Sequence, residues 1–122
     1  MSFAMKVYHY AGCGTCKKAL AWLSSQGKRD AATLIDLVAT PPSKKVLSDL
    51  WKRSGLPLER FFNTSGMSYR DGGFKDRLPT MSDDDKLNAL AADGKLVKRP
   101  ILDTGTSVRV GFREPEWAAA LG

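Results

Sequence analysis

The sequence contains few of the residues that bind metals or form disulfide networks. Its 122 residues include only two cysteines and one histidine. A closed zinc site needs four ligands, and one Cys-x-x-Cys pair cannot supply them. Two cysteines are also too few for a small secreted domain held together by disulfides. These shortages argue against a zinc module and a disulfide scaffold, and we predict a protein with no bound metal or cofactor.

Long apolar runs are absent as well. No stretch approaches the ~20 apolar residues of a membrane-spanning helix. The N-terminus, Met-Ser-Phe-Ala-Met-Lys, lacks the apolar segment of a secretory signal peptide. We therefore expect a cytoplasmic protein without membrane contact, in a compartment that keeps thiols reduced.

Basic residues exceed acidic ones, nineteen to thirteen, which gives a net charge of +6. Such an excess fits nucleic acid, an acidic protein or a small anion as a partner. The basic residues are spread along the chain, whereas a nucleic-acid site needs a basic stripe interleaved with aromatics. We therefore expect no direct nucleic-acid binding. The length suits a single domain over residues 1–122, and we expect a monomer.

Both cysteines and the histidine lie in one stretch, residues 7–23. Residues 6–10 are rich in β-formers and predict a strand. Gly12 and Gly14 suit a tight turn. Apolar residues then recur at helical spacing from Cys16 to Gln26-Gly27. Cys13 is therefore expected at the junction between a strand and a helix.

A cysteine at the start of a helix has distinctive chemistry. The unpaired N–H groups of the first turn and the helix dipole stabilise a thiolate, which lowers the thiol pKa. Lys17, Lys18 and a protonated His9 would add positive charge. Cys16 lies about one turn away, close enough to close a disulfide with Cys13. A reactive pair is favoured, although two inert buried cysteines are an alternative.

The rest of the chain predicts an alternation of strands and helices. Residues 32–38 form a second strand, parallel to the first. Residues 63–73 read as a polar loop, and Asp83, Asp84 and Asp85 as the acidic first turn of a helix rather than a metal site. The remaining expected elements are a helix from the Ser43 cap to Gly55 with Val46, Leu47, Leu50 and Trp51 on its apolar face, a short helix or turn at 56–62, a helix from the Ser82 cap to Asp93, a hairpin of strands 101–102 and 108–112, and a closing helix at 114–121.

Four segments in this order resemble the arsenate reductase/Spx family. They are the Cys13 turn with Lys17-Lys18-Ala19-Leu20-Ala21-Trp22-Leu23, Phe62-Asn63-Thr64-Ser65-Gly66 with Tyr69-Arg70, Leu96-Val97-Lys98-Arg99-Pro100-Ile101-Leu102, and Val110-Gly111-Phe112. The resemblance implies an α/β, thioredoxin-like fold with a four-stranded mixed sheet (β-α-β … β-β-α). Its core would cover about residues 4–38 and 95–122, with a helical insertion at about 39–94.

The resemblance also implies roles for individual residues. Cys13 matches the nucleophile, and His9 a histidine that keeps it ionised. Arg99 and Arg109 match two of three arginines around the oxyanion, although each alone reads as a surface charge. Pro100 matches a cis proline beside the cysteine. The chain departs from the reductases at two positions, with Asn63 for the first arginine and Cys16 for a serine.

These residues predict an anion pocket formed by the arginines and by the backbone N–H groups of residues 12–16, including Gly12, Gly14 and Thr15. The favoured hypothesis is an arsenate reductase-like enzyme. Cys13 attacks an oxyanion or a glutathione mixed disulfide, and Cys16 or an external thiol resolves the adduct, with glutathione, glutaredoxin or thioredoxin as reductant. The alternative implied by the Spx branch is a redox-sensing regulator that binds RNA polymerase.

Overall fold

The computed structural model describes residues 5–121. The chain forms two compact units, one from Met1–Asp36 and Arg99–Gly122 and the other from Leu37–Lys98. Residues 1–4 and 122 lie outside the described part. Residues 4 and 122 belong to the expected core, and residues 1–4 to the N-terminus that we expect to lack a signal peptide. The expected arrangement of one domain with an insertion at 39–94 stays a prediction.

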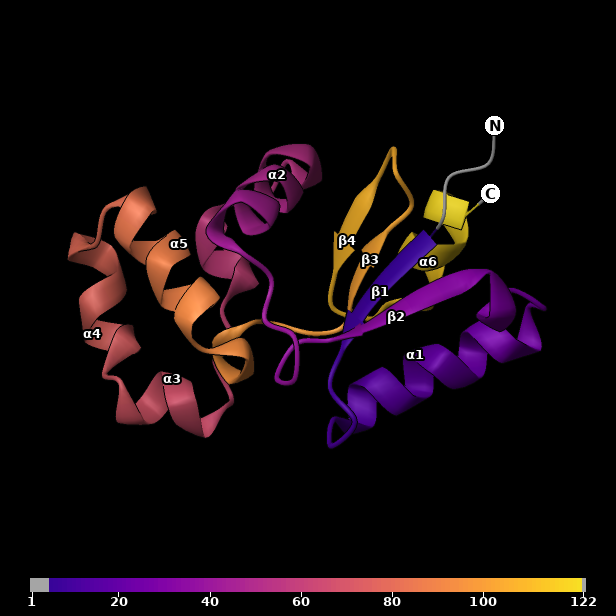
Figure 1. Cartoon of the computed structure of the whole chain (residues 1–122), viewed down its shortest axis with the longest axis horizontal. Coiled ribbons are helices and arrows are strands. Elements are labelled where there is room, and N and C mark those ends of the chain that lie inside the picture. Colours follow the sequence, from indigo (N-terminus) through magenta and orange to yellow (C-terminus); the bar gives the residue numbers. More distant parts are fainter. Residues whose placement is uncertain (1–4, 122) are drawn as a thin grey trace. The chain divides into compact units, whose positions relative to one another are not determined.

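The first unit contains a four-stranded sheet (Figure 1). Its strands are β1 (Met5–His9), β2 (Ala32–Asp36), β3 (Ile101–Asp103) and β4 (Val108–Val110), in the order β2-β1-β3-β4. β1 pairs parallel with β2 and antiparallel with β3, and β3 pairs antiparallel with β4. The predicted mixed sheet and hairpin are confirmed. The outer strands end earlier than expected, β4 because Gly111 takes a left-handed conformation with φ 81°.

Two helices pack on one face of this sheet. They are α1 (Gly14–Ser25) and α6 (Glu114–Leu121). The core beneath them contains Met5, Val7, Ala19, Leu23, Leu102 and Trp117. The indole Nε1 of Trp117 donates a hydrogen bond to the Gly111 carbonyl at 2.9 Å. This anchor fixes α6 against the end of β4, so the hairpin and both helices share one core.

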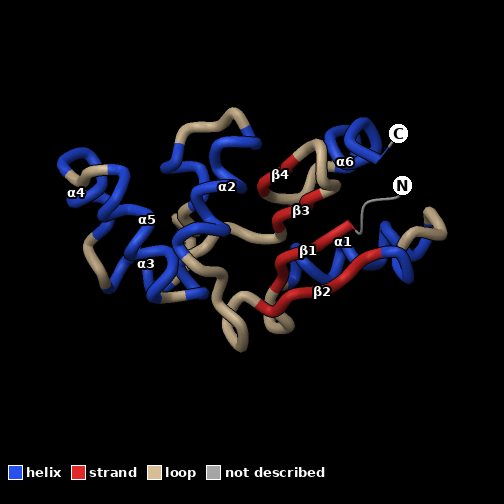
Figure 2. Tube along the Cα trace, turned by 45° about the horizontal axis from the view of Figure 1, so that its top comes forward, coloured by secondary structure: helices blue, strands red, loops and turns tan. Residues whose placement is uncertain are grey.

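The second unit is built from helices (Figure 2). They are α2 (Lys44–Ser54), α3 (Met67–Asp71), α4 (Phe74–Arg77) and α5 (Asp83–Ala92). This unit also contains 3-10 turns at Leu58–Phe61, Leu78–Thr80 and Gly94–Leu96. In the first unit, the 3-10 turn Arg29–Ala31 precedes β2. The predicted caps are confirmed, because Ser43 and Ser82 side chains accept hydrogen bonds from the third residue of their helices, at 3.2 and 3.1 Å. Gly55 ends α2 in a left-handed conformation.

Two predictions for this unit are wrong. The segment 63–73, expected to be a loop, contains α3. The Tyr69 ring stacks on Phe74 at 6.2 Å, and Phe74 packs on Phe62 at 5.6 Å. This aromatic packing stabilises helical turns that the polar, glycine-rich sequence does not favour. Val46, placed on the buried face of α2, is 37% exposed.

Removal of the Ser82 cap gives a small, local test of this unit. Ser82→Ala is expected to lower the free energy of unfolding by about 1 kcal/mol, because the Asp85 N–H loses its acceptor. Urea denaturation measures the change. Ser48→Ala, inside α2, is the control and should not destabilise the protein, since alanine is the better helix former.

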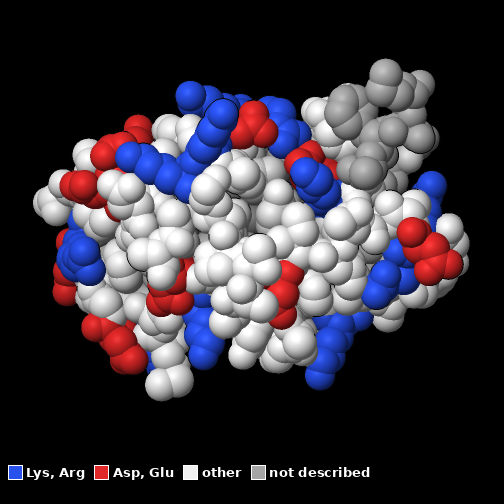
Figure 3. All heavy atoms as spheres, in the orientation of Figure 1, with Lys and Arg blue, Asp and Glu red and all other residues white. Residues whose placement is uncertain are grey.

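Two further features of the chain are the distribution of its surface charge and the hydropathy of its helices. In the face drawn in Figure 3, Lys and Arg are scattered among Asp and Glu, and most of the surface belongs to other residues. Within residues 5–121, no helix combines the length and the apolar character that crossing a bilayer requires.

Candidate active site

Cys13 occupies the N-cap position of α1. Its N–H donates to the Tyr10 carbonyl at 3.0 Å, which closes the turn after β1. Its backbone is extended (φ −96°, ψ 118°), and its Sγ accepts a hydrogen bond from the Cys16 N–H at 3.4 Å. The helix starts at Gly14, directly after Cys13, and the Cys13 sulfur caps its first turn. Cys13 therefore lies at the strand-to-helix junction, as predicted.

The surroundings of the two thiols shift their pKa values in opposite directions. Burial acts to raise the pKa of Cys13, but the Cys16 thiol and N–H and the Arg99 guanidinium outweigh it, so the pKa lies below its ordinary value. Burial and the Cys13 thiol raise the pKa of Cys16 to about 12. Cys16 is 1% exposed, whereas Cys13 is partly exposed. A partly exposed thiol with a lowered pKa, beside a buried thiol with a raised pKa, favours a reactive pair over two inert cysteines.

Arg99 and Pro100 reach this site from the segment before β3. The Arg99 Cζ lies 5.2 Å from the centre of the Tyr10 ring, in a cation–π contact. The Arg99–Pro100 peptide bond is cis, as the resemblance implied. Pro100 is buried, and its carbonyl accepts a hydrogen bond from the Gly111 N–H at 2.8 Å. The Arg99 guanidinium thus lies over the Tyr10 ring, and Pro100 links Arg99 to the start of β3.

The glycines and Thr15 form the backbone of the site. Gly14 and Thr15 are the first two residues of α1, so their N–H groups have no acceptor within the helix. Gly12 lies in the turn under the Tyr10 ring. That these three residues line an anion pocket stays a prediction.

Arg109, His9 and Asn63 are not brought to the sulfur by any described contact. Arg109 lies on β4 opposite Leu102, and its Nη1 donates to the neighbouring Val108 carbonyl at 3.4 Å. His9 ends β1 opposite Asp36. Neither is among the groups that shift the Cys13 pKa. Asn63 belongs to the helical unit, where its N–H donates to the Leu96 carbonyl at 2.7 Å. Their proposed roles stay predictions.

Tyr10 is the residue that sequence reasoning missed. It follows directly after β1 and contributes both its carbonyl, to Cys13, and its ring, to Arg99. The available signal was an aromatic residue three positions before a cysteine in a glycine-containing turn. Taken alone, that aromatic reads as the end of a strand.

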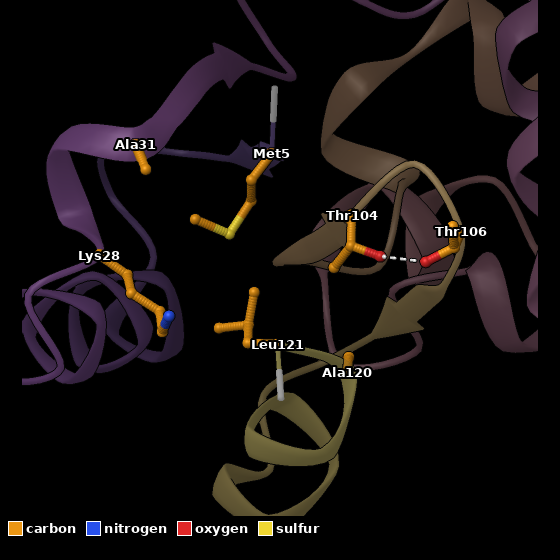
Figure 4. Close-up of a pocket in the computed structure, with 7 residues that line it drawn as sticks. All are labelled: Met5, Lys28, Ala31, Thr104, Thr106, Ala120 and Leu121. Atoms are coloured by element: carbon orange, nitrogen blue, oxygen red, sulfur yellow. Dashed lines mark hydrogen bonds between the residues drawn. The ribbon is translucent and has the colours of Figure 1, made fainter. Parts of the chain in front are cut away.

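A separate pocket lies at the opposite end of β1 from the cysteine turn (Figure 4). It is lined by Met5, Lys28, Ala31, Thr104, Thr106, Ala120 and Leu121. It contains one cationic side chain and no thiol. In the part of the chain that the structure describes, no group of three or more His, Cys, Asp or Glu could hold a metal ion.

Two curated proteins are similar to this chain over most of its length. The chain is 46% identical to the uncharacterized protein YusI of Bacillus subtilis, over 93% of this chain and 95% of the relative. It is 28% identical to an arsenate reductase of Neisseria meningitidis, over 88% and 89%.

Solved structures are similar to this chain over nearly its whole length. An ArsC family related protein from Bacteroides fragilis superposes with a TM-score of 0.91 at 36% identity, covering 98% of both chains. The arsenate reductase from Vibrio cholerae superposes with a TM-score of 0.83 at 28% identity, covering 100% of both. The model of the ArsC family matches residues 8–120. The chain therefore belongs to the ArsC family, which has the thioredoxin-like fold and includes arsenate reductases.

Proposed function

We propose that this protein is a thiol-dependent reductase in which Cys13 is the nucleophile and Cys16 the resolving thiol. The observation that carries the proposal is the position of the Cys13 sulfur. It caps α1, accepts the Cys16 N–H and lies beside Arg99, while Cys16 is buried next to it. The pair thus combines a partly exposed attacking sulfur, whose pKa is lowered, with a buried resolving thiol, whose pKa is raised.

The reaction with a glutathione mixed disulfide takes two exchanges. The Cys13 thiolate attacks the glutathione sulfur, and the substrate leaves as a thiolate. Cys16 then loses its proton to solvent and attacks the Cys13 sulfur, which releases glutathione as a thiolate and forms the Cys13–Cys16 disulfide. The substrate gains two electrons, and the two cysteines lose them. Glutathione, glutaredoxin or thioredoxin would return both cysteines to thiols.

An arsenate-like oxyanion would follow the same order. The Cys13 thiolate displaces an oxygen of the oxyanion, which leaves as water after protonation, and a sulfur–arsenic bond forms. Cys16 or glutathione then attacks the Cys13 sulfur. The sulfur–arsenic bond breaks, and its electron pair stays on arsenic, which is reduced from the +5 to the +3 state. The products are arsenite and a disulfide.

The cationic side chains near the sulfur favour a glutathione mixed disulfide over an arsenate-like oxyanion as the substrate. Arg99 contacts the site, whereas Asn63 replaces one family arginine and Arg109 has no described contact with Cys13. A doubly charged oxyanion depends on several charge-assisted hydrogen bonds, each contributing about 1.5–3 kcal/mol. A disulfide does not need them. Because turnover requires both cysteines to be reduced again, the proposal places the protein in the cytoplasm.

Trapping of the first intermediate tests the proposal. Cys16→Ser, incubated with glutathione disulfide, is expected to accumulate one glutathione on Cys13, because the resolving thiol is missing. The wild-type protein should pass on to the Cys13–Cys16 disulfide. Peptide mapping by mass spectrometry without reduction distinguishes the two products. A stable glutathione adduct on wild-type Cys13, or a Cys16→Ser protein without any adduct, would contradict the mechanism.

A further inference from the structure

We propose that Tyr10 is a positioning residue, whose ring holds the Arg99 guanidinium beside the Cys13 sulfur. The inference deepens the proposed function and rests on it, since it concerns how the same nucleophile is activated. It starts from one geometric fact. Tyr10 contacts both functional groups, Cys13 through its main chain and Arg99 through its side chain.

The contact with Cys13 is set by the turn. The Tyr10 carbonyl accepts the Cys13 N–H at 3.0 Å, so Tyr10 and Cys13 are the first and last residues of a hydrogen-bonded four-residue turn. The sulfur then caps α1 through the Cys16 N–H. The position of Tyr10 is therefore fixed relative to that of the sulfur by covalent geometry and two hydrogen bonds.

The ring occupies the space that a side chain at position 12 would need. A Cβ at this position would lie 2.9 Å from Cε2 and 3.3 Å from Cζ of the Tyr10 ring. Because contacts that short do not occur, any larger residue at position 12 would displace the ring. Glycine lets the ring rest against the backbone, and one face of the ring is left for Arg99.

Arg99 uses the ring in the way a guanidinium favours. Its Cζ is 5.2 Å from the ring centre, within the range of a cation–π contact. A guanidinium over an aromatic ring can still use the N–H groups in its plane as hydrogen-bond donors. A long, flexible side chain that is held in this way loses less freedom when it meets the sulfur. The ring thus pre-orients the charge that lowers the Cys13 pKa.

The test compares variants that keep or remove the aromatic face. Tyr10→Leu and Tyr10→Met remove it and retain apolar bulk over Gly12, whereas Tyr10→Phe keeps it. The readout is the pH profile of iodoacetamide alkylation at Cys13. In the Leu and Met variants we expect the profile to move to higher pH and the rate on its acidic side to fall about two- to fivefold, as expected for the loss of a cation–π contact. Tyr10→Phe should retain the wild-type profile.

A double-mutant cycle separates positioning from a general structural role. In an Arg99→Gln background, Tyr10→Leu should produce no further shift of the profile, because the group it positions is gone. Thermal melting shows whether each variant is folded. If only one of Tyr10→Leu and Tyr10→Met folds, that variant alone is enough for the test. An unchanged profile in Tyr10→Leu or Tyr10→Met, a Tyr10→Phe profile shifted like theirs, or a full extra shift in the Arg99→Gln background would each overturn the proposal.

The outcome is independent of whether the proposed reductase reaction occurs. Absence of glutathione trapping at Cys13 would remove the proposed function even if the Tyr10 variants shift the profile as expected. Conversely, normal trapping with an unchanged profile in the Tyr10 variants would remove only the role of Tyr10.

Discussion

Cys13→Ser is expected to abolish reductase turnover, whichever oxidised substrate is supplied. A serine hydroxyl remains protonated at neutral pH, so the residue that caps α1 no longer carries a nucleophile. Loss of a covalent nucleophile lowers turnover on the order of 10³-fold or more. Coupled assays with a glutathione mixed disulfide, and with arsenate plus glutathione and glutaredoxin, measure the loss. Cys16→Ser is the matched control and should retain part of the activity when glutathione resolves the adduct. Full turnover by Cys13→Ser would contradict the mechanism.

The pH dependence of the wild-type rate has a defined sign. Interactions with Cys16 and Arg99 outweigh burial and lower the Cys13 pKa, so the thiolate forms at lower pH than in an ordinary cysteine. Alkylation of Cys13 should rise through that lowered pKa and level off above it. Cys16, with a pKa of about 12, should stay unmodified at neutral pH in the folded protein. If both cysteines reacted at equal rates there, the assignment of attacking and resolving thiols would be wrong.

The sequence predicts the position of Cys13 in the fold well because the signal is local. A short strand, two glycines and a helical period place Cys13 at the junction between strand and helix, where the structure has it. Ser43 and Ser82 cap the helices that begin directly after them. Such features depend on neighbours in the chain. The mixed sheet follows from the order of strands, since a β-α-β unit is parallel and a short hairpin is antiparallel.

Features that depend on distant residues could not be predicted in this way. The helix α3 exists because Tyr69 packs on Phe74, while the local composition of residues 63–73 is typical of a loop. The role of Tyr10 depends on Arg99, which is far away in the sequence. The family resemblance implied a role for Arg99, but its contact with Tyr10 depends on the fold and has no signal in the sequence.

The second large expected effect concerns Gly94, which is buried at the start of the last 3-10 turn of the helical unit. A Cβ at this position would lie 1.8 Å from the carbonyl oxygen of Leu37 and 2.5 Å from its carbonyl carbon. Both are backbone atoms, and Leu37 is fully buried, so no flexible side chain can yield. For Gly94→Ala to fold, two backbone segments must separate, and the packing around Leu37 must open.

We therefore expect Gly94→Ala to lower the free energy of unfolding by about 3 kcal/mol or more, at the upper end of the range for overpacked sites. Urea denaturation followed by circular dichroism measures the change. Gly14→Ala is the matched control, because no heavy atom lies within 4 Å of its added Cβ. Gly14 also lies in the first turn of α1, where alanine is favoured by up to about 1 kcal/mol. The same methyl group should thus destabilise the protein at position 94 and leave it unchanged or stabilise it at position 14. Equal stabilities for the two variants would mean that the Leu37 and Gly94 backbones do not approach each other as closely as the structure places them.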